Sequence, residues 1–106
     1  MATRKILFTG RETADNITSI KLVGISISGS ALLLLSDDGT PAANGNSATQ
    51  CVYIGSEDVT AANGWPMRAN DTLILEPKDR NDQIDPSEVY ILGSAAGQVI
   101  AWMLLA

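Results

Sequence analysis

The apolar residues of this chain fall into short runs that are rich in Val, Ile and Leu and are separated by Gly, Asn, Asp and Pro. Almost no run has the period of an amphipathic helix, because apolar residues either alternate with polar ones or follow one another without a break. About seven such runs joined by polar turns indicate antiparallel β structure rather than a parallel α/β sheet. We therefore predict an all-β fold, a single small β-sandwich or jelly-roll-like domain, with a small closed barrel as the alternative.

The limits of these runs predict where the strands lie. In residues 20–27 the apolar side switches from even to odd positions at Gly24, which predicts a strand with a β-bulge or bend there. The turn-rich passage 58–67 and two polar stretches, 36–49 and 78–87, are predicted as turns and loops. The predicted strands cover residues 6–8, 20–27, 31–35, 50–54, 72–75, 88–92 and 98–105.

Size and composition limit the domain organisation. The 106 residues suffice for one hydrophobic core but not for two. Because 45% of the residues are hydrophobic and only 5% are aromatic, the core must be built mainly from aliphatic side chains. We assign residues 17–106 to the sandwich domain and residues 1–16, which include basic residues and few apolar ones, to an extended N-terminal arm.

The residue types that are scarce in this chain argue against several classes of function. A net charge of −5 argues against nucleic acid as a partner, because proteins that bind nucleic acid usually present a basic face. The chain has no histidine, which removes the commonest general base and metal ligand. Cys51 is the only cysteine, so an internal disulfide is excluded and a small buried side chain is expected. We expect a protein that is not an enzyme and that uses no metal, cofactor or small-molecule substrate.

The densest group of acidic and amide side chains lies in and just after the polar stretch 78–87. Its spacing partly matches a calcium-binding loop, but Gln83, Ile84 and Tyr90 occupy positions where that loop needs a ligand or a glycine. We therefore expect a solvated loop with local Asx turns. The group consists of Asp79, Asn81, Asp82, Asp85 and Glu88.

The apolar segments are too short to involve a membrane. The run 31–35 is far shorter than a membrane span, and the first residues lack the hydrophobic region of a signal peptide. We therefore expect no membrane partner and synthesis in the cytoplasm.

The candidates for partner contacts are aromatic, apolar and basic side chains. Trp65 follows the Asn63-Gly64 turn, where it would stack on a sugar ring, fill a neighbour's pocket or close the end of the sandwich. The run 98–105 is apolar in both of its alternating sets, so one set fills the core and the other needs a cover from a subunit or partner. The candidate contact residues are Arg4, Lys5, Ile6, Phe8, Arg11, Trp65, Trp102 and Leu104.

Two segments have similar sequences: each is an apolar run that contains a tyrosine and ends in Gly-Ser. They are Val52-Tyr53-Ile54-Gly55-Ser56 and Val89-Tyr90-Ile91-Leu92-Gly93-Ser94. With the strand at 73–75 and the turns Asp58-Val59-Thr60, Asn63-Gly64 and Pro66-Met67, they make the chain from Gln50 onward resemble small β-sandwich accessory virion proteins of tailed bacteriophages. That pattern has Gly in the turn before the strand at Leu73, where this chain has Asn70. Since Asn tolerates the left-handed conformation, we expect the same turn to form with Asn70.

The resemblance implies an accessory structural protein of the capsid, neck or tail. The first hypothesis is a capsid decoration (cement) protein on the outer capsid surface of the virion, which binds the major capsid protein of the assembled head. Such a protein would associate with itself as a trimer or another cyclic homo-oligomer, because sites on a shell lie at its rotation axes. The alternatives are a host-binding carbohydrate module of a neck or tail fibre, with Trp65 as its platform, and a head-completion or tail component.

Overall fold

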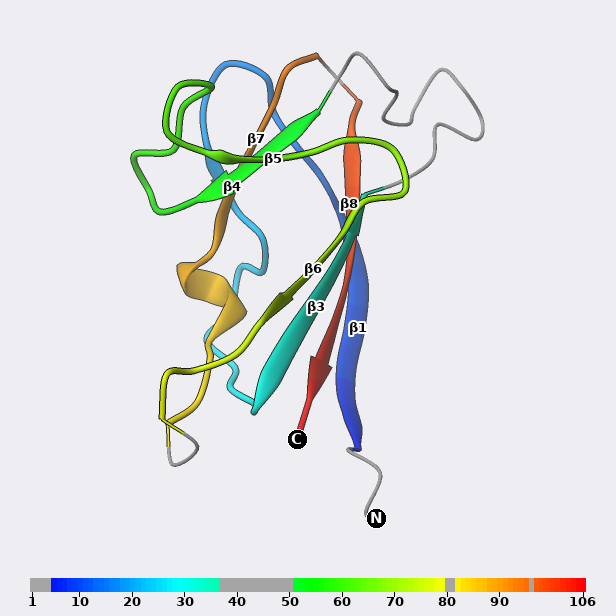
Figure 1. Ribbon diagram of the computed structural model, residues 1–106, viewed down its shortest axis with the longest axis vertical. Helices are drawn as coiled ribbons and strands as arrows, with labels where there is room; N and C mark the ends of the chain where they lie inside the picture. Colours follow the sequence, from blue (N-terminus) through cyan, green and yellow to red (C-terminus); the bar gives the residue numbers. More distant parts are fainter. Residues whose placement is uncertain (1–4, 37–50, 80–81, 96) are drawn as a thin grey trace.

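The computed structural model describes residues 5–36, 51–79, 82–95 and 97–106, which fold into two antiparallel sheets packed face to face (Figure 1). The all-β fold predicted from the sequence is confirmed, and the arrangement is that of a small β-sandwich. Sheet A has the strand order β1 (Ile6–Thr13), β8 (Val99–Leu105), β3 (Ala31–Ser36) and β6 (Thr72–Leu75). Sheet B has the order β2 (Ile20–Lys21), β7 (Tyr90–Gly93), β4 (Val52–Gly55) and β5 (Trp65–Met67), and the short 3-10 helix η1 (Pro86–Glu88) precedes β7.

The two similar segments that contain Tyr53 and Tyr90 form neighbouring strands of sheet B. β4 pairs with β7 in antiparallel register, with Ile54 opposite Ile91 and Val52 opposite Gly93. The side chains of Val52, Ile54 and Ile91 point into the core and are buried. The two segments are therefore similar because both strands need an apolar inner face and both end at a glycine.

The core lies between the sheets and is aliphatic, as the composition predicts. Along β3 the buried residues Leu32 and Leu34 alternate with the more exposed Leu33 and Leu35, and along β8 Ile100 and Leu104 are fully buried. Among the described residues no aromatic side chain belongs to the fully buried set, although Trp102 packs against the core from its margin. The buried free thiol of Cys51 also confirms its prediction.

The predicted strand at residues 20–27 is wrong beyond its first two residues. Only Ile20–Lys21 forms a strand, β2, because the next two side chains, Leu22 and Val23, are both buried. Neighbours in a regular strand point to opposite faces, so the chain must leave the extended conformation to bury both. Backbone hydrogen bonds then hold the segment in place, from Leu22 N to Val89 O at 2.8 Å and from Ile84 N to Gly29 O at 2.8 Å.

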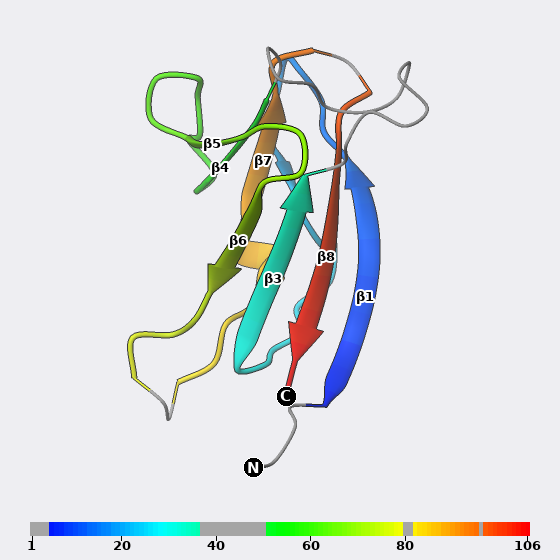
Figure 2. The same ribbon diagram turned by 45° about the vertical axis from the view of Figure 1, so that its right-hand side comes forward.

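Two other segments differ in extent from their prediction. The strand expected at residues 6–8 continues to Thr13 as β1, an edge strand of sheet A that pairs with β8 along its length (Figure 2). The passage 58–67, predicted as turns, ends in strand β5, which pairs with β4. The loop predicted for 36–49 lies outside the described residues apart from Ser36, which ends β3.

The turn before β6 has the predicted conformation. Asn70 has a φ of 66°, in the left-handed region, and the Asp71 N–H donates a hydrogen bond to the Arg68 carbonyl at 3.0 Å. The Asp71 carboxylate in turn accepts a hydrogen bond from the Arg68 N–H at 2.8 Å. Asn70 thus takes the place of a glycine in this turn, which leads the chain from β5 in sheet B to β6 in sheet A.

Candidate functional site

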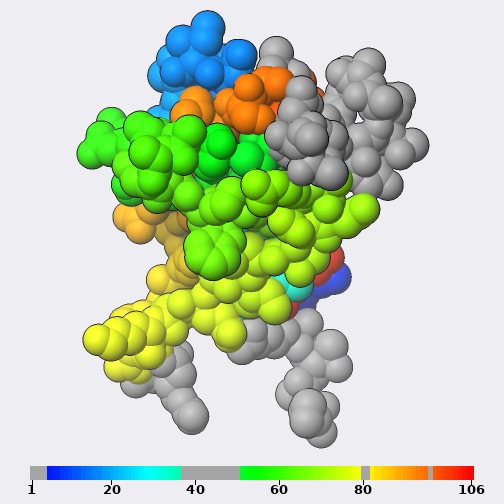
Figure 3. Space-filling model, turned by 45° about the horizontal axis from the view of Figure 1, so that its top comes forward, coloured from blue at the N-terminus to red at the C-terminus, as the bar shows by residue number. Residues whose placement is uncertain are grey.

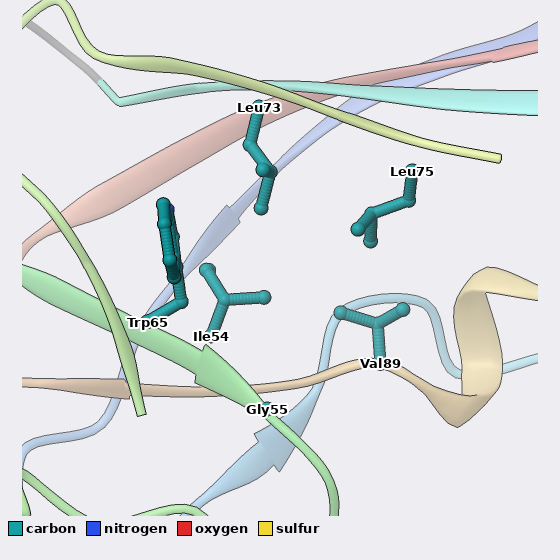
Figure 4. A pocket seen from close by; sticks show the side chains of 6 residues that line it. All are labelled: Ile54, Gly55, Trp65, Leu73, Leu75 and Val89. Atoms are coloured by element: carbon teal, nitrogen blue, oxygen red, sulfur yellow. The ribbon is translucent and has the colours of Figure 1, made fainter. Parts of the chain in front are cut away.

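An apolar cleft opens between the two sheets at the side of the molecule where each sheet ends, at β5 in sheet B and β6 in sheet A. Its volume is about 390 Å³, and side chains from both sheets point toward one another across it (Figure 4). Figure 3 shows the segment that contains β5, in green, packed against the yellow-green segment that contains β6. The cleft is lined by Ile54, Gly55, Trp65, Leu73, Leu75 and Val89.

Strand alternation and one tight turn build this cleft. In β6, Leu73 and Leu75 face inward while Ile74 faces outward with 58% of its surface exposed. On the other side, the turn before β5 is closed by hydrogen bonds from Thr60 N to Asn63 Oδ1 at 2.7 Å and from Gly64 N to Thr60 O at 2.8 Å. Gly64 has to be glycine because a Cβ there would lie 2.6 Å from the Tyr53 Cβ.

Trp65 therefore stands at the mouth of the cleft with 62% of its surface exposed. It belongs to strand β5, not to a turn as predicted, and its ring lies beside Ile54 and Leu73 (Figure 4). The cleft is lined by aliphatic side chains, a glycine and Trp65, whose indole N–H is the one polar side-chain group of the lining, so the cleft offers little hydrogen bonding to the hydroxyl groups of a sugar. The geometry suits an apolar side chain or an apolar peptide segment.

The second apolar surface is the outer face of sheet A, on the side away from sheet B. The strand registers place Met103, Leu33 and Ile74 in one row, with Leu35 and Ala101 in the next. These residues line a shallow hollow of about 390 Å³. Polar residues border both apolar rows on the β1 side, namely Thr9 and Arg11, and Thr72 on β6 ends the second row. An apolar centre with a polar rim is the usual composition of a protein–protein contact.

The predicted contact residues divide between surface and core. Lys5, Ile6, Phe8 and Arg11 are exposed on or beside β1, whereas Arg4 lies outside the described residues. The prediction for Leu104 is wrong, because this side chain faces sheet B and is fully buried.

Trp102 is half-buried on the core side of sheet A, against Gly10 of β1, where it packs against the margin of the core. Sequence reasoning missed Ile74 and the leucines of β6. The signal was present there, since 72–75 is a strand in which every residue after Thr72 is apolar.

The acidic group after β6 has a structural role at Asp85. The Asp85 carboxylate accepts hydrogen bonds from the Ser26 hydroxyl, from the Ser87 N–H at 2.8 Å and from the Ile27 N–H at 3.4 Å. The hydrogen bond from Ser26 and those from Ser87 lower the pKa of Asp85 to about 2. This carboxylate joins residues 26–27, which are distant in the chain, to the start of η1, and only its hydrogen bond from Ser87 is the local bonding expected of a loop acid.

Neither a metal centre nor a membrane-spanning helix is found in the part of the chain that the structure describes. No group of three or more Cys, Asp or Glu side chains there is placed to hold a metal ion. No helix there is long and apolar enough to cross a membrane. Comparison of the chain with protein-family models, with curated proteins and with solved structures gives no match.

Proposed function

We propose that this protein is an accessory structural protein of a phage virion, a decoration (cement) protein that binds the assembled head and stabilises contacts between coat subunits. The observation that carries the proposal is the apolar outer face of sheet A, on which Leu35 and Ile74 are exposed and Leu33 is half-buried. A monomer rarely leaves a continuous apolar sheet face in water, because such a face favours association. The resemblance of residues 50–106 to small virion proteins supports the same class of function.

Such a protein would act by mass action. A protein that binds the assembled lattice but not the dissociated coat subunits stabilises the lattice by the free energy of the bound copies. This mechanism needs contact surface and correct geometry but no reacting side chain. The outer capsid surface is the expected location, with the major capsid protein and further copies of this chain as partners.

The test is to mix purified protein with undecorated heads, and separately with host cells, and to sediment each mixture. We expect stoichiometric binding to heads, and we expect decorated heads to release their DNA at a higher temperature than bare heads. A Leu35→Lys variant should bind heads at least tenfold more weakly, since a charge would enter the apolar face. The matched control is Ile25→Lys, which changes a side chain that is 66% exposed and belongs to no strand.

The alternative of a host-binding carbohydrate module rests on the exposed Trp65. Its ring could stack on a sugar, but the cleft beside it lacks polar side chains to select one. Adsorption to cells without binding to heads, lost on Trp65→Ala, would replace the decoration proposal by this alternative. Binding to neither would contradict both.

A further inference from the structure

The exposed apolar side chains gather at two opposite edges of sheet A. Of the eight large hydrophobic side chains that are exposed among the described residues, three are consecutive on β1: Ile6 at 54%, Leu7 at 37% and Phe8 at 47%. Three more, Leu35, Trp65 and Ile74, lie on or beside β6. We call residues 5–9 the donor edge and Thr72–Leu75 with Trp65 the acceptor edge. The remaining two, Ile17 and Ile25, belong to neither edge.

The four edge strands differ in how well they are protected from pairing with another chain. In sheet B, β5 contains Pro66, which cannot donate a ladder hydrogen bond, and β2 is only two residues long. In sheet A, the second half of β1 carries Arg11 and Glu12. In contrast, β6 has neither a charge nor a proline. The first three residues of β1 are apolar, although the pairing with β8 shifts register between Ile6 and Phe8. The donor and acceptor edges are therefore the two least protected strand edges of the sandwich.

The strand directions allow the two edges to join. Each neighbouring pair in sheet A is antiparallel, so β1 runs antiparallel to β6 at the opposite side of the sheet (Figure 2). If one copy is placed beside another, its β1 extends the neighbour's sheet A as a further antiparallel strand. The charges also match, because Lys5 precedes β1 while Asp71 and Glu76 flank β6.

The side-chain directions favour one register. Phe8 lies opposite the buried Leu104, so it points to the inner side of sheet A, and Leu73 points to the same side in β6. Pairing Phe8 of one copy with Leu73 of the next puts the phenylalanine ring at the mouth of the apolar cleft, beside Trp65. The same register sets Thr9 opposite Thr72. An apolar side chain then enters a cleft that is lined only by apolar residues and glycine.

We infer that copies of this chain associate head to tail, with the donor edge of one copy added to β6 of the next and Phe8 inserted into the cleft. Two different surfaces meet in this contact, so it is heterologous and gives a ring larger than a dimer, or a filament where the rotation does not close. The inference supplies a contact for the association with further copies of this chain and rests on that part of the proposed function. It does not depend on the capsid.

The test uses two full-length variants that each block one edge. Phe8→Lys blocks the donor edge and Ile74→Lys blocks the acceptor edge, and both change exposed side chains. We expect the unmodified protein to sediment as an oligomer larger than a dimer and each variant alone as a monomer. An equimolar mixture of the two should form a one-to-one dimer, since one intact edge remains on each partner. Ile17→Lys is the control and should leave the oligomer unchanged.

A cross-link checks the register without disturbing the fold. The double variant Thr9→Cys with Thr72→Cys should form a ladder of linked chains on oxidation, while each single variant should form none. The buried Cys51 does not compete. Circular dichroism and a cooperative thermal transition establish that each variant is folded.

Three outcomes would overturn the inference: an unmodified protein that stays monomeric at high concentration, a mixture that does not re-associate, or cross-linking of a single variant. The second and third would indicate an isologous contact. None of these measurements uses capsids, so they test the head-to-tail contact separately from the decoration role. If the protein binds heads but does not associate head to tail, only the head-to-tail contact is refuted. If it forms the oligomer but does not bind heads, the decoration role is refuted.

Discussion

Gly10 of β1 lies opposite Trp102 of β8, and the indole ring of Trp102 covers the glycine so closely that a Cβ at Gly10 would lie 2.8 Å from the ring atom Cζ2. The ring fills the space that a side chain at position 10 would take. It also packs against the margin of the hydrophobic core. This contact fastens the edge strand β1, and with it the exposed residues Ile6 and Phe8, to the rest of sheet A.

Gly10→Ala should therefore destabilise the protein. The new methyl group would push the Trp102 ring off its site, and overpacking of this kind costs about 1–3 kcal/mol. The free energy of unfolding in urea measures the effect. Gly24→Ala is the matched control, since a Cβ there meets no atom within 4 Å, and we expect its stability to change by about 0.5 kcal/mol or less. Equal stability of the two variants would contradict the role assigned to the Trp102 contact.

Asn70 should tolerate glycine better than alanine. Its φ of 66° is strained for alanine, so Asn70→Ala should lower the free energy of unfolding by about 1 kcal/mol, whereas Asn70→Gly should stay within about 0.5 kcal/mol of the unmodified protein. Chemical denaturation of the three proteins under one set of conditions provides the comparison. The reverse order would show that the conformation at Asn70 does not limit the turn.

Asp85 should make stability depend on pH in acid. Its pKa is about 2 in the folded protein, below the ordinary value of 3.8, so its contribution is fully present above pH 3.8 and is lost as the pH falls through about 2. The stability difference between the unmodified protein and Asp85→Asn should therefore be largest near neutral pH and should shrink toward pH 2. Urea titrations at several pH values measure this difference, and NMR titration of the carboxyl carbon reports the pKa directly. Asp82→Asn, in the same loop, is the control. A difference that does not vary with pH would exclude the ionised carboxylate as its source.

Leu34 and Leu35 are adjacent on β3 but should differ sharply in their effect on folding. Leu34 is buried between the sheets, so Leu34→Ala should cost about 2–5 kcal/mol of stability. Leu35 is 44% exposed on the outer face of sheet A, so Leu35→Ala should cost less than about 1 kcal/mol. Denaturant unfolding at low protein concentration separates the two. Similar costs would mean that the outer face is covered within a single chain.

Much of the fold could be predicted because strand patterns are local. The run at 72–75 and the run at the C-terminus form strands close to their predicted limits, and the aliphatic core follows from the scarcity of aromatic residues. The strand prediction failed at residues 22–27, where burial of adjacent side chains overrides the two-residue period of a strand. Leu22 and Val23 are both buried next to β7, and no alternating pattern indicates that the chain bends there.

The candidate site was less predictable, because it joins residues that are distant in the chain. The apolar C-terminal run indicated a second covered face, but not that Leu33, Ile74 and Met103 share one row. In the same way, two of the three roles predicted for Trp65 require an exposed ring and the third does not, so the sequence left its exposure open. Nothing near it in the chain indicates that Leu73 and Val89 complete its cleft.

By itself the sequence determined the class of the fold, the aliphatic core and the lack of histidine chemistry. These properties follow from composition and from the two-residue period of a strand, which each segment expresses without its neighbours. Only the tertiary structure decided which strands lie at the edges, that Phe8 and Leu73 point to the same side of sheet A, and that a cleft opens beside β6. Strand order and register depend on pairing between distant segments and on how two twisted sheets overlap, and no local pattern encodes either of them.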